Sequence, residues 1–207
     1  MEDIFWGNLY RNQEKIANEV KGSFKSVANY FMADEFIFPD LDKTQNEVKI
    51  LIGETNRQHK DMNEYISIDK DAFGYFKSVG DKLGVNSRDS RNAIEFIKSN
   101  ISPLVLDLKR FWNRARPYQY GYLFELPLHP HSSKSGVTTP SYPSGHSLQA
   151  IAYKYYILNK YPNLNKELSE MAEKVHISRI ALGVHFESDI KFSIEIGEYL
   201  KFNNLYV

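Results

Sequence analysis

The sequence predicts an all-α protein that folds as a single-domain helical bundle over residues 1–207. Two observations support this fold class: apolar residues recur at helical spacing in most segments, and the alternation that marks a β-strand is weak throughout. A length of 207 residues suits one domain, and an aromatic content of 14% is enough for a large core. We find no internal repeat and no low-complexity tract, which favours an ordinary compact bundle.

The first hundred residues predict helices without a recognisable motif. Apolar residues from Ile16 to Phe31 recur at helical spacing, and Pro39 breaks the segment that follows into a loop. Further helices are expected over residues 46–59, 71–83 and 87–98. Gly84 ends the second of these, and Ser87 is the expected N-cap of the third.

The second half predicts sharper helical patterns. Helices are expected over residues 101–116, 148–155, 168–182 and 190–200. Pro117 ends the first of them, because a residue before proline avoids the α region, and Gly183 interrupts the chain between the last two. Residues 123–142 form a long loop rich in proline, which we expect to cover the mouth of a pocket.

Charge balance and the lack of cysteine exclude several classes of protein. The chain has 26 basic and 26 acidic residues, whereas a general nucleic-acid binder needs a basic surface. Without cysteine there is no disulfide, cysteine zinc site, iron–sulfur cluster or cysteine nucleophile. The start, 1–4, is acidic where a signal peptide is basic, and the longest uncharged stretch, 135–153, contains prolines. We therefore expect a soluble, cytoplasmic protein with no membrane span.

Several cations occupy unusual positions. Arg179 lies on the same helix face as core residues, where a guanidinium needs an anionic partner. A structural Asp or Glu at the helix edge is the simpler explanation. Lys109 and Arg116 lie seven residues apart, which is about two helical turns, so both could point the same way. Arg114, close to them, is expected to be a solvated surface charge.

Two further groups could bind or transform an anion. The segment 143–146, Pro-Ser-Gly-His, precedes a predicted helix, so its backbone N–H groups could bind an anion there. An ordinary capping turn with Ser144 as N-cap is the alternative. His185 and Asp189 lie four residues apart, so the carboxylate could hold one imidazole nitrogen and leave the other as a nucleophile or base. A structural His–Asp pair would explain the same spacing.

Together these groups resemble the three-part signature of the type 2 phosphatidic acid phosphatase and vanadium haloperoxidase superfamily. The three parts are Lys109 with Arg116-Pro117, then Pro143-Ser144-Gly145-His146, then Ser178-Arg179 with His185 and Asp189. All three match in order and spacing. The resemblance covers residues 109–189 and leaves 1–100 without a motif.

The amino-acid sequences of the motifs are most similar to those of soluble bacterial class A-like acid phosphatases. Residues 114–117 and 183–189 carry this likeness. Those phosphatases are typically exported and often contain cysteine, and this chain shows neither an export signal nor a cysteine. Residues 140–143 also resemble the haloperoxidases, so that branch stays open.

The resemblance implies metal-independent hydrolysis of phosphomonoesters through a phosphohistidine. His185 would be the nucleophile, Asp189 would orient it, and His146 would act as general acid and then as base. The phosphoryl group would be bound by Lys109, Arg116, Ser144, Gly145 and Arg179. Tyr142 is a further candidate for lining the pocket. No cofactor and no metal are expected, and vanadate is expected to inhibit.

Two other functions stay open at this point. A vanadium-dependent haloperoxidase would use the same pocket, with vanadate as cofactor and His185 as its ligand. A non-catalytic phosphate-binding protein is the third hypothesis, although simple binding does not need both histidines. The expected partner is a small-molecule phosphate ester, such as a nucleoside monophosphate, a sugar phosphate or a small lipid phosphate. A homo-oligomer stays open, and the sequence identifies no interface.

Overall fold

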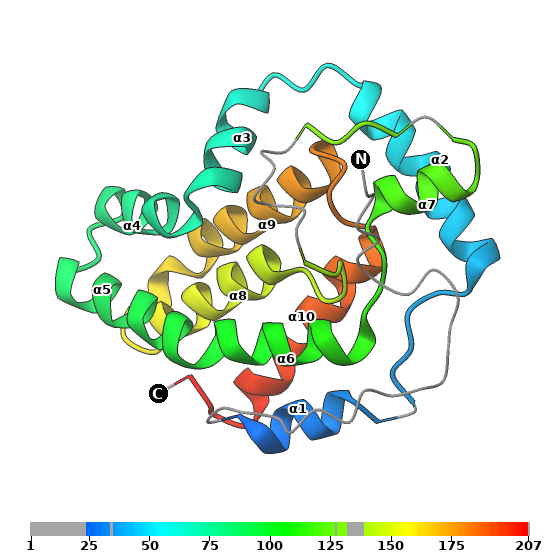
Figure 1. The fold of residues 1–207 in the computed structure, drawn as a ribbon. Helices are drawn as coiled ribbons and strands as arrows, with labels where there is room; N and C mark the ends of the chain where they lie inside the picture. The colour runs from blue at the N-terminus through cyan, green and yellow to red at the C-terminus, as the bar shows by residue number, and fades with distance from the viewer. Residues whose placement is uncertain (1–23, 34, 127, 132–138, 207) are drawn as a thin grey trace.

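The computed structural model describes residues 24–33, 35–126, 128–131 and 139–206. In these ranges every regular element is a helix and none is a strand, which confirms the all-α prediction (Figure 1). The α-helices are α1 (Lys25–Phe31), α2 (Leu41–Asn56), α3 (Met62–Lys70), α4 (Ala72–Lys82), α5 (Ser87–Phe96), α6 (Ser102–Trp112), α7 (Pro117–Leu123), α8 (Gly145–Leu158), α9 (Asn165–Ala181) and α10 (Glu187–Phe202). A π-helical turn, η1 (Ile97–Ile101), joins α5 to α6, and a 3-10 turn, η3 (Pro162–Leu164), precedes α9.

The centre of the bundle is α8, the helix that follows the Pro-Ser-Gly-His segment. It packs against α9, α10, α5 and α6, and Figure 1 shows it between them. Its buried side chains are almost all apolar or small, as expected for a helix enclosed by others. Gly197 lets α10 cross α8 closely, because a Cβ there would lie 2.4 Å from Ile151 Cγ2. This packing fixes the position of α8, and with it the Pro-Ser-Gly-His segment at its start.

The helices of the first hundred residues pack against those that carry the motifs. α2 contacts α7 and α9, and α3 contacts α9 (Figure 1). No helix is predicted over residues 60–70, yet α3 forms there with only Tyr65, Ile68 and Asp69 buried. So short an apolar face gives little periodic signal, and tertiary contacts supply its stability. α2 and α3 carry acidic side chains toward the second half of the chain.

The region around Pro117 differs from the prediction. The helix expected to reach that proline ends at Trp112, where Asn113 takes a left-handed conformation with φ 44°. Pro117 instead begins α7, at a position where the missing N–H has no intrahelical partner to lose. The residues between the two helices therefore form an extended connection, and Arg116 lies in it.

Two smaller differences concern helix ends and the limits of the description. Asn86, and not Ser87, caps α5, because its side chain accepts a hydrogen bond from the Arg88 N–H at 2.8 Å. The expected helix from Ile16 begins outside the described residues, which start within its last part and form α1. Residues 132–138 of the expected lid loop also lie outside the described ranges.

Candidate active site

The Pro-Ser-Gly-His segment forms the N-terminus of α8. Ser144 occupies the N-cap position, but its hydroxyl pairs with Ser147 Oγ at 2.9 Å and makes no hydrogen bond to a backbone N–H of the first turn. The Ser144 N–H donates to the Asp189 carbonyl at 3.2 Å, which fixes this turn against the start of α10. The first N–H groups of a helix have no intrahelical partner, so Gly145 and His146 present donors here. His146 is partly exposed.

Lys109 and Arg116 are buried and converge on two consecutive carbonyl groups. Lys109 Nζ donates to the Pro140 carbonyl, and Arg116 Nε donates to the Thr139 carbonyl at 2.6 Å. The two residues do not share a helix face, because α6 ends before Arg116. A Cβ at Gly145 would lie 3.9 Å from Lys109 Cε, so the lysine side chain passes beside the start of α8. The first two motifs therefore meet at this point.

Arg116 also links the first motif to the third. Its Nη1 lies 3.0 Å from His185 Nε2 and donates to the Val184 carbonyl at 2.8 Å. Gln119 Oε1 accepts a hydrogen bond from the Arg116 backbone N–H at 2.8 Å, so the first turn of α7 holds the arginine backbone. The guanidinium thus rests against the imidazole nitrogen that faces away from Asp189.

His185 and Asp189 form the pair that their spacing suggested, but not within a helix. His185 precedes α10, and Asp189 caps the helix by accepting the Phe186 N–H at 2.9 Å through Oδ2. The same oxygen lies 3.1 Å from His185 Nδ1. A carboxylate can only accept at this contact, which assigns the proton to Nδ1 and leaves a lone pair on Nε2.

Arg179 has both a structural partner and an unused donor. Its Nη1 binds Asp69 Oδ1 at 2.8 Å, and both side chains are almost completely buried. Its Nε lies 3.3 Å from Ser178 Oγ. Its Nη2 is buried and has no hydrogen-bond partner among the described residues. Arg179 therefore has a structural carboxylate partner, which was the simpler expectation for it. Its Nη2 group keeps two N–H donors that could bind an anion.

The electrostatics of this cluster favour a bound anion. Burial, the Arg179 charge, and then the charges of Arg116 and Lys109 lower the pKa of His146 to about 3. Burial and the same three cations hold the pKa of His185 well below its usual value. Burial also lowers the pKa of Lys109, and it lowers the pKa of Arg116 to about 10, with neighbouring cations adding to both effects. The site holds more positive charge than its carboxylates offset.

Arg114 corrects one prediction, because it is fully buried and not a solvated surface charge. Its Nη1 binds Asp189 Oδ1 at 2.7 Å, and its Nη2 binds Glu47 Oε2 at 2.9 Å. Glu47 on α2 and Asp69 on α3 belong to no motif, and sequence reasoning missed both. The only available signal was that buried cations need carboxylate partners, which does not say where these partners lie in the sequence.

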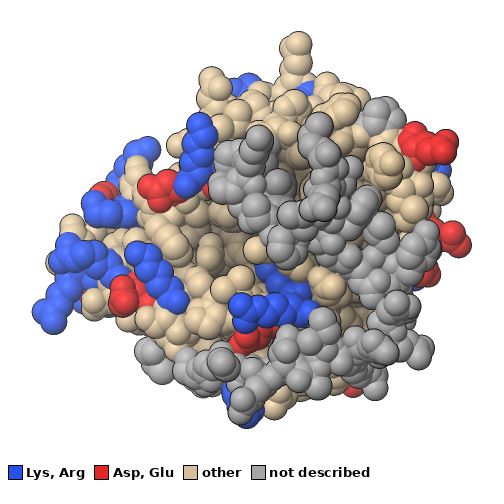
Figure 2. Space-filling model, in the orientation of Figure 1, with Lys and Arg blue, Asp and Glu red and all other residues tan. Residues whose placement is uncertain are grey.

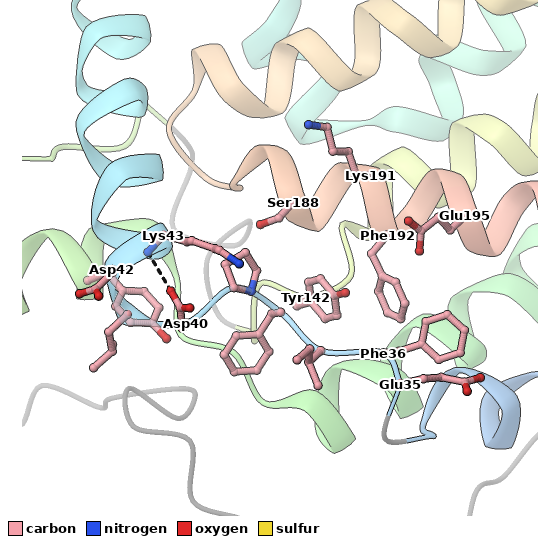
Figure 3. Close-up of a pocket in the computed structure, with 15 residues that line it drawn as sticks. Glu35, Phe36, Asp40, Asp42, Lys43, Tyr142, Ser188, Lys191, Phe192 and Glu195 are labelled. Carbon is pink, nitrogen blue, oxygen red and sulfur yellow. Dashed lines mark hydrogen bonds between the residues drawn. The ribbon is translucent and has the colours of Figure 1, made fainter.

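A separate groove of about 860 Å³ lies between residues 35–43 and the start of α10 (Figure 3). Of the described residues, none assigned to phosphate binding or catalysis lines it. Tyr142 lines this groove and stacks on Phe192 with ring centroids 4.2 Å apart. Tyr142 therefore belongs to the wall of the groove, which is distinct from the cationic cluster.

The comparisons with known proteins agree with the motifs. The model of the PAP2 superfamily matches residues 95–202, which is just over half of the chain and contains all three motif parts. The chain belongs to the PAP2 superfamily. This membership makes it a phosphatase and confirms the family resemblance. No curated protein matches the sequence.

One solved structure has the same fold as this PAP2 protein. It is the crystal structure of the first transmembrane PAP2 type phosphatidylglycerolphosphate phosphatase from Bacillus subtilis, with 21% sequence identity and a TM-score of 0.55. The match covers 87% of this chain and 89% of that chain. At this level of identity the likeness shows the shared fold.

This match does not support the expectation of a soluble protein, because a transmembrane phosphatase has the same fold. Membrane association is therefore open to this PAP2 protein, and a cytoplasmic location stays a prediction. Over the described ranges, no helix combines the length and apolar character needed to cross a membrane. In the same part of the chain, no group of three or more His, Asp or Glu side chains is placed to hold a metal ion.

Proposed function

We propose that this protein hydrolyses phosphate monoesters without a metal ion, through a phosphohistidine on His185. The observation that carries the proposal is the convergence of three buried cations, Lys109, Arg116 and Arg179, around two histidines of depressed pKa. A phosphoryl transition state spreads negative charge over three oxygens, so it needs several fixed cations. The phosphoryl dianion would be the counter-charge that this cluster lacks.

Binding would use donors that are already directed toward the site. Arg179 Nη2 has no other partner, and Arg116 and Lys109 now donate to carbonyl groups that a phosphoryl oxygen can replace as acceptors. Arginine suits this role because its planar fork matches two phosphoryl oxygens. The free N–H groups at the start of α8, with Ser144 beside them, would bind a third oxygen.

The attack step follows from the protonation of His185. With its proton on Nδ1, the Nε2 lone pair is the nucleophile, and Arg116 Nη1 now lies 3.0 Å from it. When a phosphoryl oxygen accepts the Arg116 N–H instead, the lone pair becomes free to attack phosphorus. The Nε2–P bond forms, the ester P–O bond breaks, and the leaving oxygen takes a proton from His146.

Hydrolysis of the intermediate reverses the role of His146. The imidazole takes a proton from water, the water oxygen bonds to phosphorus, and the P–N bond breaks to restore His185. A neutral histidine must gain a proton before it can act as the acid. A bound dianion offsets the cations that depress its pKa, so we expect the pKa of His146 to rise in the complex. Its partial exposure suits contact with a leaving group.

The three fixed cations supply the charge that a divalent metal supplies in other phosphatases. Metal-independent turnover is therefore expected, together with inhibition by vanadate, which can adopt the five-coordinate geometry of the transition state. The substrate we propose is a small-molecule phosphate ester. A lipid phosphate of the kind named for the fold neighbour is one candidate, beside nucleoside and sugar phosphates.

The test is hydrolysis of p-nitrophenyl phosphate by purified protein in the presence of EDTA, between about pH 4 and 8. We expect turnover by the wild type, none by His185→Ala, and normal turnover by Arg110→Ala, which removes an exposed cation. Lack of turnover at every pH would overturn the proposal. Substantial activity in His185→Ala would overturn the choice of nucleophile. The haloperoxidase alternative stays a prediction, and halide oxidation with vanadate and peroxide would test it.

A further inference from the structure

The two carboxylate oxygens of Asp189 bind different partners. Oδ2 accepts from the Phe186 N–H and faces His185 Nδ1, as described above. Oδ1 faces the other way and binds Arg114 Nη1 at 2.7 Å, while Ser141 Oγ lies 3.4 Å from it. A carboxylate held on one side alone can rotate about its C–C bond. The strong contact from Arg114 therefore sets the angle at which Oδ2 meets the imidazole.

The guanidinium of Arg114 is itself held by two aromatic rings and through both of its Nη groups. Its guanidinium carbon lies 4.2 Å from the centre of the Phe186 ring and 5.3 Å from that of Phe38. Its Nη1 also donates to Ser188 Oγ at 2.7 Å, and its Nη2 donates to Thr44 Oγ1 at 3.3 Å. All four N–H bonds of the two Nη groups already have protein acceptors, so Arg114 has no terminal donor left for a phosphate.

Glu47 supplies the charge and geometry that keep Arg114 in place. Its Oε2 accepts from Arg114 Nη2 and from Ser188 Oγ, each at 2.9 Å. Its Oε1 accepts from the Ser188 backbone N–H at 3.0 Å, so the glutamate also caps the first turn of α10 from a different helix. Both oxygens are occupied. The side chain joins α2 to the segment that carries His185 and Asp189.

We propose that Arg114 and Glu47 are positioning residues for the nucleophile. Glu47 orients Arg114, Arg114 fixes the Asp189 carboxylate, and the carboxylate keeps the proton of His185 on Nδ1 so that Nε2 stays unprotonated. This inference rests on the proposed function for its catalytic consequence. Its structural part, the tautomer of His185, can be measured independently of turnover.

The experiment uses Arg114→Lys and Glu47→Gln in the full chain. Lysine keeps the charge but cannot bridge Asp189, Ser188 and Glu47 with one planar fork. Glutamine keeps the size but places an NH₂ group against Arg114 or the Ser188 N–H, which both donate. We expect kcat to fall about 10–100-fold in each variant, the loss typical when a partner that orients a metal-binding histidine is removed. KM and inhibition by inorganic phosphate should stay close to wild type, because the phosphate-binding cations are untouched.

The second readout is the ¹⁵N NMR spectrum of histidine-labelled protein, in which His185→Ala identifies the signals of His185. The wild type should show the Nδ1–H tautomer, and both variants a mixture of tautomers. The control is Glu198→Gln on the distal half of α10, which replaces the carboxylate that accepts from the Tyr155 hydroxyl with a neutral amide. Its kcat and its His185 signals should match the wild type.

The outcomes separate the two proposals. An inactive wild type with a tautomer shift in the variants would contradict the proposed function and support the positioning role. Unchanged His185 signals in folded variants would overturn the positioning role, whatever their kcat. If Arg114→Lys does not fold, Glu47→Gln and Ser188→Ala, which removes only the hydroxyl link, decide the question by the same two readouts.

Discussion

The two histidines of the site owe their neutral state to their neighbours. Three cations and a buried setting penalise a further positive charge on His146 and His185, and so lower both pKa values. A neutral imidazole can attack phosphorus, whereas a protonated one cannot. The proposed nucleophile, His185, would therefore stay active at acidic pH, where an ordinary histidine would be protonated.

The same shifts predict how stability depends on pH. Below about pH 6.5 the unfolded chain binds protons on these histidines and the native protein does not, so the free energy of unfolding falls as the pH falls. The expected slope is roughly 1.4 kcal/mol per pH unit for each histidine. Urea unfolding in phosphate-free buffers between about pH 7 and 4.5 measures it. His146→Gln should make the slope shallower, and equal slopes in the variant and the wild type would contradict the assignment.

Single residues were predictable where a motif specifies them and not where only the fold does. Lys109, Arg116 and Arg179 stand in fixed motif positions, and the structure brings the first two to adjacent carbonyls. Arg114 lies just after the end of a helix, with no periodic pattern to show its burial. Its partner Glu47 is 67 residues away in sequence. Pairing over such a distance depends on tertiary structure.

At the scale of elements, α3 shows why the first hundred residues matter for the site. It brings Asp69 against Arg179 on α9, with 2.8 Å between Oδ1 and Nη1. The carboxylate satisfies one side of the guanidinium and leaves Nη2 without a partner among the described residues. α3 therefore balances part of the charge of Arg179 and holds the guanidinium so that Nη2 stays unused.

Removal of Asp69 should destabilise the protein strongly. Asp69→Ala leaves a buried arginine without its carboxylate, which typically costs about 3–5 kcal/mol. The control on the same helix is Glu64→Ala, which breaks the exposed ion pair with Lys174 and should cost less than about 1 kcal/mol. Thermal unfolding with and without inorganic phosphate measures both variants. Phosphate should raise the Tm of Asp69→Ala more than that of the wild type, because it becomes the main counter-charge. Equal costs for the two variants would contradict this account of α3.

Long helices were predictable, while short ones and the ends of helices were not. The stripes within 148–155 and 168–182 correctly located α8 and α9. The segments that form α3 and α7 are short and have too few apolar positions for a periodic signal. Pro117 was read as the end of a helix, although the same residue is also favoured at the first position of one. Only the left-handed turn at Asn113 resolves this ambiguity.

For the molecule as a whole, the equal totals of 26 basic and 26 acidic residues conceal an uneven distribution. On the face in Figure 2, clusters of basic side chains have acidic ones beside them, as the totals suggest. Inside, the cations Lys109, Arg116 and Arg179 outnumber the carboxylates that contact them. The molecule is neutral overall, and this buried cluster carries a local excess of positive charge.

The relation to the membrane belongs to this scale too. The fold is shared with a transmembrane phosphatase, while the described helices of this chain are too short or too polar to span a bilayer. Composition alone favoured a soluble protein, whereas the same fold also occurs in a transmembrane phosphatase. The chemistry of the site does not depend on this question.

The central claim is tested most directly by locating the phosphoryl group during turnover. The protein is mixed with p-nitrophenyl phosphate, quenched in base, which preserves a P–N bond that acid would cleave, and mapped by peptide mass spectrometry. We expect a phosphoryl group on His185 of the wild type, a larger fraction in His146→Ala, where hydrolysis of the intermediate lacks its base, and none in His185→Ala. Steady turnover with no phosphoryl group on His185, or with one on another residue, would contradict the account.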